Sequence, residues 1–308
     1  MDEYEIGSSV GTFGIPEFGT KFVRNMLVET RPTKFSELVR ISGLSHGTDV
    51  WINNAQDYIK SGDATLDEVI SVRDDIMNYL IDNGIEKGTA FKIMEFVRKG
   101  KPTKDLEKWK EYEMMLKEKN VKDWYIKSCE KIKYMFPKGH AVAYVMMAMR
   151  IAYFKVHYPL AFYAAYLTRK AFDFNSDTML AGIDRIKEER KILEELPKLD
   201  VKQKTELTLL EILIEMQARK IELLGVDIYR SAGKKFLIED GKLRPPLIAI
   251  NGLGISVVEN IVAERDKGEF ISFEDFMRRT KASKTLVEKI KEFKCVTDIP
   301  DFNQKELF

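Results

Sequence analysis

The sequence is poor in cysteine and in long apolar runs. Its two cysteines, Cys129 and Cys295, lack C-x-x-C spacing and predict neither a disulfide framework nor a zinc site, so we expect reduced thiols with a structural role. The longest apolar stretch, 141–156, is interrupted by Arg150 and Lys155 and falls short of the roughly 18 residues that a membrane span requires. We therefore expect no association with a membrane.

The first residues also lack the features of a secretory signal. The stretch MDEYEIGSSVG is acidic, with neither a basic start nor an apolar segment. A cytoplasmic protein is the resulting expectation.

Charge is plentiful but unevenly distributed. The net charge is +1, yet residues 1–85 hold 7 Lys and Arg against 14 Asp and Glu, whereas residues 86–170 hold 19 against 9. The basic block fits two interpretations: a solvated, lysine-rich face of an amphipathic helix, or a surface that binds a polyanion.

Helical periodicity dominates the chain and predicts a mainly α fold. One helix is expected to run from Thr65 to a stop at Gly84, because Thr65 and Glu68 have the spacing of a capping box. Strand signal is confined to a short β-hairpin around Asp240-Gly241. The length of 308 residues suggests about two domains.

A Gly-Leu-Gly turn near the C-terminus has the pattern of a helix-hairpin-helix. Gly252, Leu253 and Gly254 follow an apolar segment and precede a predicted helix that starts near Ile255. The glycines permit backbone conformations closed to other residues, and the amides of the helix start would point at a DNA phosphate. An ordinary tight turn between two helices is the alternative.

A second, degenerate hairpin is predicted about thirty residues later, where Lys281-Ala282-Ser283-Lys284 would replace the glycine turn. The DNA-binding residues predicted from the two hairpins are Gly252, Leu253, Gly254, Ile255, Lys281, Ser283 and Lys284.

The segment YMFPKGHAVAYVMMAMRIAYFKVHYP, residues 134–159, raises a question of its own. Its middle is apolar enough to belong in a protein core, yet the predicted helix opens with Lys138, Gly139 and His140 just after Pro137. A cation and a histidine at a helix start suit an anion, whereas a histidine packed in the core is the alternative.

Several blocks of the chain resemble one known family. The stretches GTFGIPEFGTKFVRNML, ISGLSHGTDVW, RDDIMNYLI, AFKIMEFVRKGK, the segment 134–166 and DIYRS resemble, in this order, the C-terminal third of the PolC-type bacterial DNA polymerase III. The resemblance implies helical fingers at 1–225, a helix-hairpin-helix duplex-binding domain at 226–302 and a clamp-binding tail at 303–308. The partners it implies are deoxynucleotide, primer-template DNA, a sliding clamp and the palm-containing remainder of the polymerase.

The resemblance also implies that the helix opening at Lys138 faces the incoming nucleotide. A triphosphate must be held while its phosphorus meets the primer hydroxyl, and cations at a helix start suit that task. For Arg73 and Arg98, surface salt bridging is the alternative. The nucleotide-binding residues expected on this basis are Lys138, His140, Tyr144, Phe136, Ser45, His46, Arg73 and Arg98.

None of the site residues expected so far is one of the acidic residues with which a polymerase holds two magnesium ions. In this family they belong to the palm, which precedes the matched region, so Mg²⁺ is expected on the palm and not on this chain. Asp74, Asp75 and Asp173 are superficially suitable but fall inside blocks assigned to the fingers. We therefore predict no catalytic and no metal-binding residue here, and a chain that is inactive alone.

The last residues, QKELF, resemble a clamp-binding peptide. Gln304, Leu307 and Phe308 match that pattern, whereas Lys305 and Glu306 depart from its commonest forms. A non-catalytic module that binds DNA and tethers a partner to the clamp is the alternative function.

Overall fold

The computed structural model describes residues 6–296 and 299–303, which are mainly helical, as predicted. They form fifteen α-helices and one two-stranded antiparallel hairpin. The chain divides into two compact units: residues 14–152 form the first unit, and residues from 153 onward join those up to Phe13 in the second unit. The predicted domain boundary at 225/226 stays a prediction.

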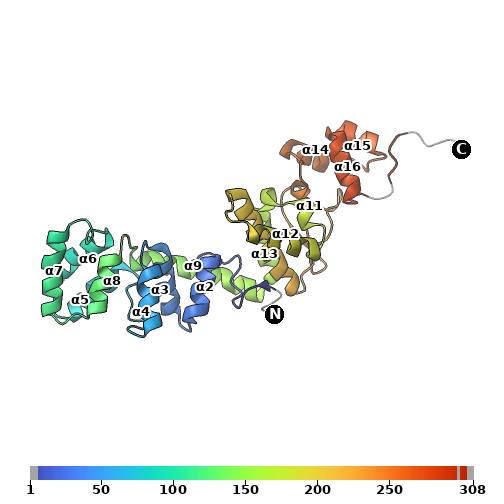
Figure 1. Cartoon of the computed structure of the whole chain (residues 1–308). Coiled ribbons are helices and arrows are strands. Elements are labelled where there is room, and N and C mark those ends of the chain that lie inside the picture. The colour runs from blue at the N-terminus through green and yellow to red at the C-terminus, as the bar shows by residue number, and fades with distance from the viewer. Residues whose placement is uncertain (1–5, 297–298, 304–308) are drawn as a thin grey trace. The chain divides into compact units, whose positions relative to one another are not determined.

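The first unit holds seven complete helices and most of an eighth, labelled in Figure 1. Buried apolar side chains line one face of each longer helix, as in Ile76 and Leu80 of α5 and Ile93 and Val97 of α6. The elements are α2 (Lys21–Thr30), α3 (Phe35–His46), the π-helical turn η1 (Trp51–Ala55), α4 (Gln56–Ser61), α5 (Arg73–Asp82), α6 (Lys87–Arg98), α7 (Leu106–Glu118), α8 (Asp123–Lys131) and α9 (Lys138–His157).

The helix predicted from Thr65 begins eight residues later, at Arg73, so that boundary was wrong. Glu68 does accept the Thr65 amide at 2.9 Å, but the pair closes a single turn. The chain then runs through buried residues 69–72, and α5 starts where the Asp75 carboxylate accepts the Ser71 and Val72 amides. A capping pair can thus close one turn without starting a helix.

The second unit holds the remaining helices and the hairpin. Its longest helix, α13, is buried over eight consecutive residues, 209–216, and lies at the centre of this unit. The elements are α10 (Pro159–Arg169), the 3₁₀ turn η2 (Ala171–Asp173), α11 (Ser176–Met179), α12 (Ile183–Glu195), α13 (Val201–Ala218), β1 (Leu237–Glu239), β2 (Lys242–Arg244), the 3₁₀ turn η3 (Leu247–Ala249), α14 (Ile255–Arg265), α15 (Phe273–Thr280) and α16 (Lys284–Glu292).

The predicted hairpin is confirmed. β1 and β2 pair antiparallel with Glu239 opposite Lys242. Asp240 and Gly241 connect them with φ values of 49° and 77°, the left-handed pair that a tight two-residue hairpin turn needs.

A buried ion pair fixes the segment before residue 14 to the second unit. The Lys155 ammonium lies 2.6 Å from the Glu215 carboxylate and donates to the carbonyls of Gly11 and Phe13 at 3.0 and 2.5 Å. Tyr163 donates to the same carboxylate at 2.8 Å. Since Lys155 is 2% exposed, its charge serves this internal network and not a ligand at the surface.

Both cysteines are free and buried, in agreement with a structural role. Burial raises the pKa of the Cys295 thiol to about 12, and it raises that of Cys129 as well. No helix in the part of the chain that the structure describes combines the length and hydrophobicity needed to cross a membrane.

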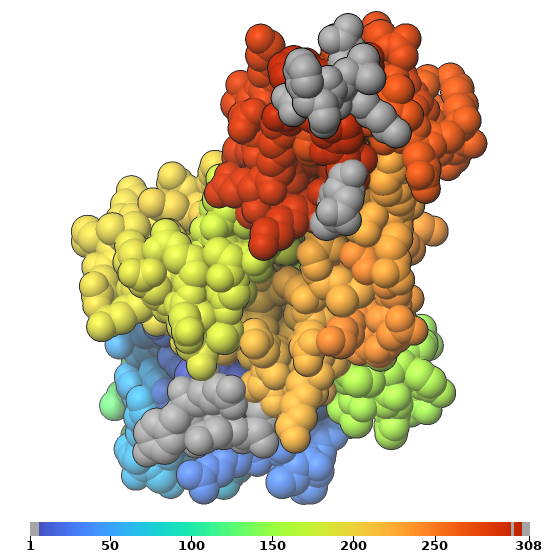
Figure 2. All heavy atoms as spheres, turned by 90° about the vertical axis from the view of Figure 1, so that its right-hand side faces the viewer, coloured from blue at the N-terminus to red at the C-terminus, as the bar shows by residue number. Residues whose placement is uncertain are grey.

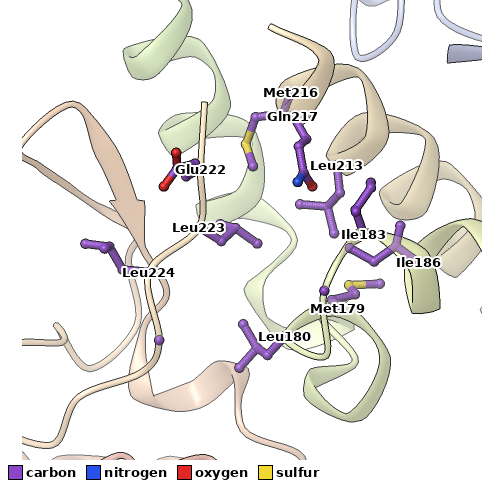
Figure 3. Close-up of a pocket in the computed structure, with 12 residues that line it drawn as sticks. Met179, Leu180, Ile183, Ile186, Leu213, Met216, Gln217, Glu222, Leu223 and Leu224 are labelled. Carbon is purple, nitrogen blue, oxygen red and sulfur yellow. The ribbon is translucent and has the colours of Figure 1, made fainter. Parts of the chain in front are cut away.

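A pocket of about 330 Å³ lies in the second unit beside α12 and α13. Its wall is mostly Leu, Ile and Met side chains, with Gln217 and Glu222 as polar members (Figure 3). Glu222 is already paired with Lys242 at 2.6 Å. None of the predicted site residues lines this pocket.

Candidate functional site

The residues predicted to bind nucleotide converge in the first unit around the segment 134–140. Three backbone hydrogen bonds bring them there: the Thr48 amide donates to Tyr134 O at 2.9 Å, the Met135 amide to Arg98 O at 3.3 Å, and the Arg73 amide to Phe136 O at 3.1 Å. The end of α3, the start of α5 and the end of α6 are thereby tied to the chain that leads into α9. Residues from four separate sequence blocks become neighbours.

Four aromatic side chains form a continuous row at this point. The Phe136 ring stacks on His140 with centroids 5.0 Å apart, and His140 lies 4.5 Å from Tyr144 one turn along α9. On its other side Phe136 meets His46 edge-on at 6.2 Å. His140 and Tyr144 are exposed, so the core-histidine alternative for His140 is wrong.

The orientation of His46 is fixed by groups that the sequence did not single out. Its Nδ1 lies 2.8 Å from Ser42 O and 3.3 Å from the Glu17 carboxylate. Ser45 Oγ also lies 3.1 Å from this nitrogen. Because Nδ1 faces these partners, Nε2 is the ring nitrogen left for a ligand.

Three cations gather on one carboxylate beside this row. Glu95 accepts from Nε and Nη2 of Arg98, and it lies 2.9 Å from the Lys99 ammonium and 3.7 Å from Arg73. The hydrogen bonds from Arg98 and Lys99 outweigh the effect of burial and lower the pKa of Glu95 to about 2. One anion thus holds three cations, and the cluster keeps a net charge of +2 next to the start of α9. Salt bridging and a phosphate role are therefore compatible for Arg73 and Arg98.

The amides at the start of α9 are less available than expected. The Lys138 amide donates to Asp74 Oδ2 at 2.6 Å, and the amides of His140 and Ala141 donate to Pro137 O. Of the first four amides of α9, three are thus already engaged, and only that of Gly139 has no partner among the described residues. The Lys138 ammonium, in contrast, has no partner among the residues that the structure describes, and its side chain is exposed.

The three carboxylates that resembled metal ligands have other partners. Asp74 accepts the Lys138 amide, Asp75 accepts two amides before α5, and Asp173 pairs with Lys170 at 3.2 Å. Within residues 6–296 and 299–303, no group of three or more His, Cys, Asp or Glu side chains is placed to hold a metal ion.

The apolar middle of α9 is not a core helix, contrary to expectation. Ala141, Val145 and Ala148 are buried, but other large side chains of the same helix are 44–50% exposed. Those side chains are Tyr144, Met146, Met147 and Met149. The burial stripe consists of small residues, because these let the helix lie close to its neighbours while the large residues face outward.

The first predicted hairpin turn has a left-handed glycine followed by a glycine helix cap. Gly252 has φ +91°, and Gly254 caps α14 with its carbonyl accepting the Val257 and Val258 amides at 3.1 Å. The amides of residues 254–256 have no hydrogen-bond partner in the described part of the chain. The Leu253 side chain is 5% exposed, so it anchors the turn in the core and is not accessible to DNA.

The second hairpin repeats this geometry without glycine. Lys281 takes the left-handed position with φ 63°, Ala282 is buried like Leu253, and Ser283 caps α16 with ψ 160° against 154° at Gly254. Ser283 Oγ accepts the Leu286 amide at 3.3 Å, so its oxygen serves as a helix cap. Lys281 and Lys284 are exposed. The degenerate hairpin predicted from the sequence is present.

The predicted clamp-binding residues Gln304, Leu307 and Phe308 lie outside the described residues. Three partners of the site were missed: Glu17, Asp74 and Glu95. Arg98 and Lys99 have the helical spacing that indicates a salt bridge with Glu95. The pairs Glu17–His46, Glu95–Arg73 and Asp74–Lys138 give no such signal, because their members lie far apart in the chain.

Comparison with known proteins identifies relatives of this chain. A model of the "Bacterial DNA polymerase III alpha subunit finger domain" matches residues 2–120, and a "Helix-hairpin-helix motif" model matches residues 220–305. The chain is 56% identical over 309 residues to the "DNA polymerase III PolC-type" of Caldanaerobacter subterraneus, covering 100% of this chain and 22% of that protein. It is 53% identical to the proteins of the same description from Thermotoga maritima and Bacillus subtilis, again over its whole length and 22% and 21% of theirs.

The matches cover both units, and the chain spans about a fifth of the length of these relatives. The helical content, the hairpin turns and the two family models agree. The chain belongs to the PolC-type DNA polymerase III family, of which it spans the finger domain and the helix-hairpin-helix motif.

Proposed function

We propose that this chain supplies the nucleotide-binding fingers and a duplex-binding module of a replicative, DNA-directed DNA polymerase. One observation carries the proposal: the eight residues predicted to meet the nucleotide, drawn from four separate blocks, gather at the start of α9. A structural role alone gives no reason for an exposed lysine, two exposed histidines and a cation cluster to lie together there.

The arrangement suits a nucleotide, whose triphosphate and whose base or sugar would meet different side chains. Lys138 and the cluster around Glu95 provide positive charge, and such charge stabilises the phosphates where phosphoryl transfer depends on positioning. The row of Phe136, His140 and Tyr144 offers flat surfaces to the rest of the nucleotide. Because Asp74 occupies the Lys138 amide, side chains make most of the proposed phosphate contacts.

Lys138→Ala tests the nucleotide site. In the complex with the palm-containing part of the polymerase, magnesium-assisted deoxynucleotide binding should weaken about tenfold or more, the worth of one charge-assisted contact. Lys110→Ala removes an exposed lysine of α7 and is the matched control. Unchanged nucleotide affinity of Lys138→Ala, with DNA binding intact, would instead support the non-catalytic tethering module.

The two hairpins are proposed to bind the phosphates of the primer-template duplex. Each presents amides of a helix start behind a turn that brings the backbone close to its surroundings. A Cβ added at Gly254 would meet nothing within 4 Å in the protein. Gly254→Ala should therefore leave the chain folded and weaken duplex binding equally on all sequences, as fluorescence anisotropy would measure. A loss that depends on sequence would contradict phosphate contact.

We propose that the catalytic residues for primer extension lie outside this chain. The carboxylates of Asp74, Asp75 and Asp173 have the structural partners given above, and we derive no metal-dependent step from them. The chain alone should not extend a primer in the presence of Mg²⁺ and deoxynucleotides. Robust synthesis by the purified chain would overturn this assignment.

The C-terminal residues Gln304, Leu307 and Phe308 are proposed to bind the sliding clamp, on the sequence pattern alone. Deleting Leu307 and Phe308 should abolish clamp binding in surface plasmon resonance, because the apolar pair would fill the pocket. Equal affinity of the shortened chain would refute the proposal.

A further inference from the structure

The turn of the first hairpin is held by a short helix far from it in the sequence. Asn251, the residue before Gly252, donates its amide to Ser176 Oγ at 3.0 Å. Its side-chain nitrogen donates to Asn175 Oδ1 at 2.8 Å and to Asp177 Oδ2 at 3.0 Å. Residues 175–177 at the start of α11 therefore fix both the backbone and the side chain of Asn251.

The same α11 carboxylate also reaches the second hairpin. Asp177 pairs with Lys289 of α16, whose ammonium lies 3.2 Å from each carboxylate oxygen. In Figure 2 the red surface of α16 adjoins the yellow-green surface around α11. We call Asn175, Ser176 and Asp177 with their partners Asn251 and Lys289 the α11 bridge.

We propose that Asp177 and Asn251 are positioning residues for duplex binding, through which the α11 bridge sets the distance between the two hairpin turns. The proposal rests on the proposed function of the hairpins. It goes beyond that function because neither residue touches DNA in it.

The physical reason lies in the stiffness of the ligand. Phosphates along a DNA duplex have fixed spacing, so two sets of helix amides bind together only if their separation matches it. Within the second unit, α14 and α15 contact one another directly, and Asn260 of α14 donates to Thr280 O, next to the second turn, at 3.1 Å. Asp177 adds a separate link, since its carboxylate accepts from Asn251 and pairs with Lys289 of α16. Losing that carboxylate removes one of the links that set the separation of the two turns, so the gain from binding both phosphates at once is reduced.

The sign of the effect separates positioning from charge. Asp177 is acidic, so its removal makes the surface more positive and, by charge alone, should strengthen DNA binding. If Asp177 acts by positioning, its removal should instead weaken DNA binding. Asp173→Ala removes another exposed carboxylate of the same segment, one paired with Lys170 and outside the bridge, and is the matched control.

The experiment measures binding of the full chain to a fluorescent duplex over a series of salt concentrations. Asp177→Ala should weaken binding about tenfold with an unchanged slope of log affinity against log salt, because no phosphate contact is lost. Lys284→Ala should lower that slope by about 0.9, the value for one neutralised phosphate. Asp177→Asn keeps an acceptor for Asn251 and should fall between Asp177→Ala and the unmodified chain.

Thermal melting checks that each variant is folded, and Asp177→Asn serves as the second variant if Asp177→Ala melts early. Binding by Asp177→Ala that is as tight as by Asp173→Ala overturns the inference, and so does a fall in its salt slope. If Lys284→Ala and Gly254→Ala also leave binding unchanged, the DNA-binding function of the hairpins fails instead.

Discussion

The turn before α14 and the turn before α16 have nearly the same backbone but are built from different residues. A left-handed residue, a buried apolar residue and a helix cap follow one another in both: Gly252, Leu253 and Gly254 in the first turn, and Lys281, Ala282 and Ser283 in the second. In the first turn glycine takes the left-handed position at no steric cost. In the second a lysine takes it under strain.

The two turns also differ in what holds them. The first depends on hydrogen bonds to α11, whereas the second lies between α15 and α16 and follows Thr280, whose hydroxyl accepts the Ala282 amide at 3.2 Å. The helix α15 that leads into it is stabilised by ion pairs of Asp275 with Arg278 at 2.6 Å and with Arg279 at 3.2 Å. The comparison shows that the hairpin geometry needs a residue with a left-handed φ followed by a buried apolar residue. The left-handed residue need not be glycine. Where glycine is absent, the neighbouring helix has to supply more stabilisation.

The largest effect is expected from Asp275→Ala. This carboxylate is 4% exposed and accepts from both arginines and from the Ile271 amide, so its loss should lower the free energy of unfolding by about 2–3 kcal/mol. Urea unfolding of the variant measures it. Glu288→Ala, at a mostly exposed carboxylate of α16, should change it by less than about 0.5 kcal/mol. Equal effects of the two variants would remove the distinction between the hairpins.

Gly252→Ala should cost about 1–2 kcal/mol of unfolding free energy, because an L-residue is strained at this left-handed φ. Space is not the cause, since a Cβ there would meet nothing within 4 Å. Gly254→Ala has equal space and an ordinary φ of −74°, so it is the control and should cost less than Gly252→Ala, only the preference for glycine over alanine at an N-cap. A cost at Gly254 as large as that at Gly252 would contradict this account.

The reciprocal change, Lys281→Gly, should raise the free energy of unfolding by at most about 1 kcal/mol, since glycine adopts the same φ without strain. Duplex affinity should nevertheless fall, because an exposed cation next to the proposed phosphate site is lost. Urea unfolding and fluorescence anisotropy on the same preparation separate the two effects. A loss of stability would show that the lysine side chain supports the fold.

The smallest effect is expected from low pH, which should destabilise the second hairpin. Burial raises the pKa of Asp275, but the hydrogen bonds from Arg278 and Arg279 outweigh it, and the pKa is lowered from its usual 3.8. A depressed pKa means that the stabilisation is full above about pH 4 and is lost as pH falls below that value. Hydrogen exchange at pH 3 should show α15 opening before α14. Simultaneous opening would indicate that Asp275 is not a separate support.

The candidate nucleotide site shows how far sequence reasoning reached. Resemblance to a family pointed to Lys138, His140, Ser45 and His46, and these residues lie around the same segment. Glu17, which orients His46, lies far from it in the chain, so no local pattern indicates this pair. Glu95 has the helical spacing of a salt bridge with Arg98, but its contact with Arg73 depends on how α5 and α6 pack.

The local sequence pattern of α9 also predicted the exposure of its side chains wrongly. The middle of α9 reads as a core segment, but its large residues face outward and only its small ones are buried. Lys155 reads as a surface cation and is 2% exposed. Hydrophobicity along one helix cannot say which face its neighbours cover, because that depends on how distant elements pack.

The sequence by itself determined the features that arise between near neighbours: the helical content, the Asp240-Gly241 turn and both hairpin turns. These follow from backbone preferences within a few residues. Only the tertiary structure decided that Asp74 occupies the amide of Lys138, 64 positions away, and that Asp177 holds Lys289 across 112 positions. Such contacts form when packing brings distant polar groups together, and no local preference specifies the partner.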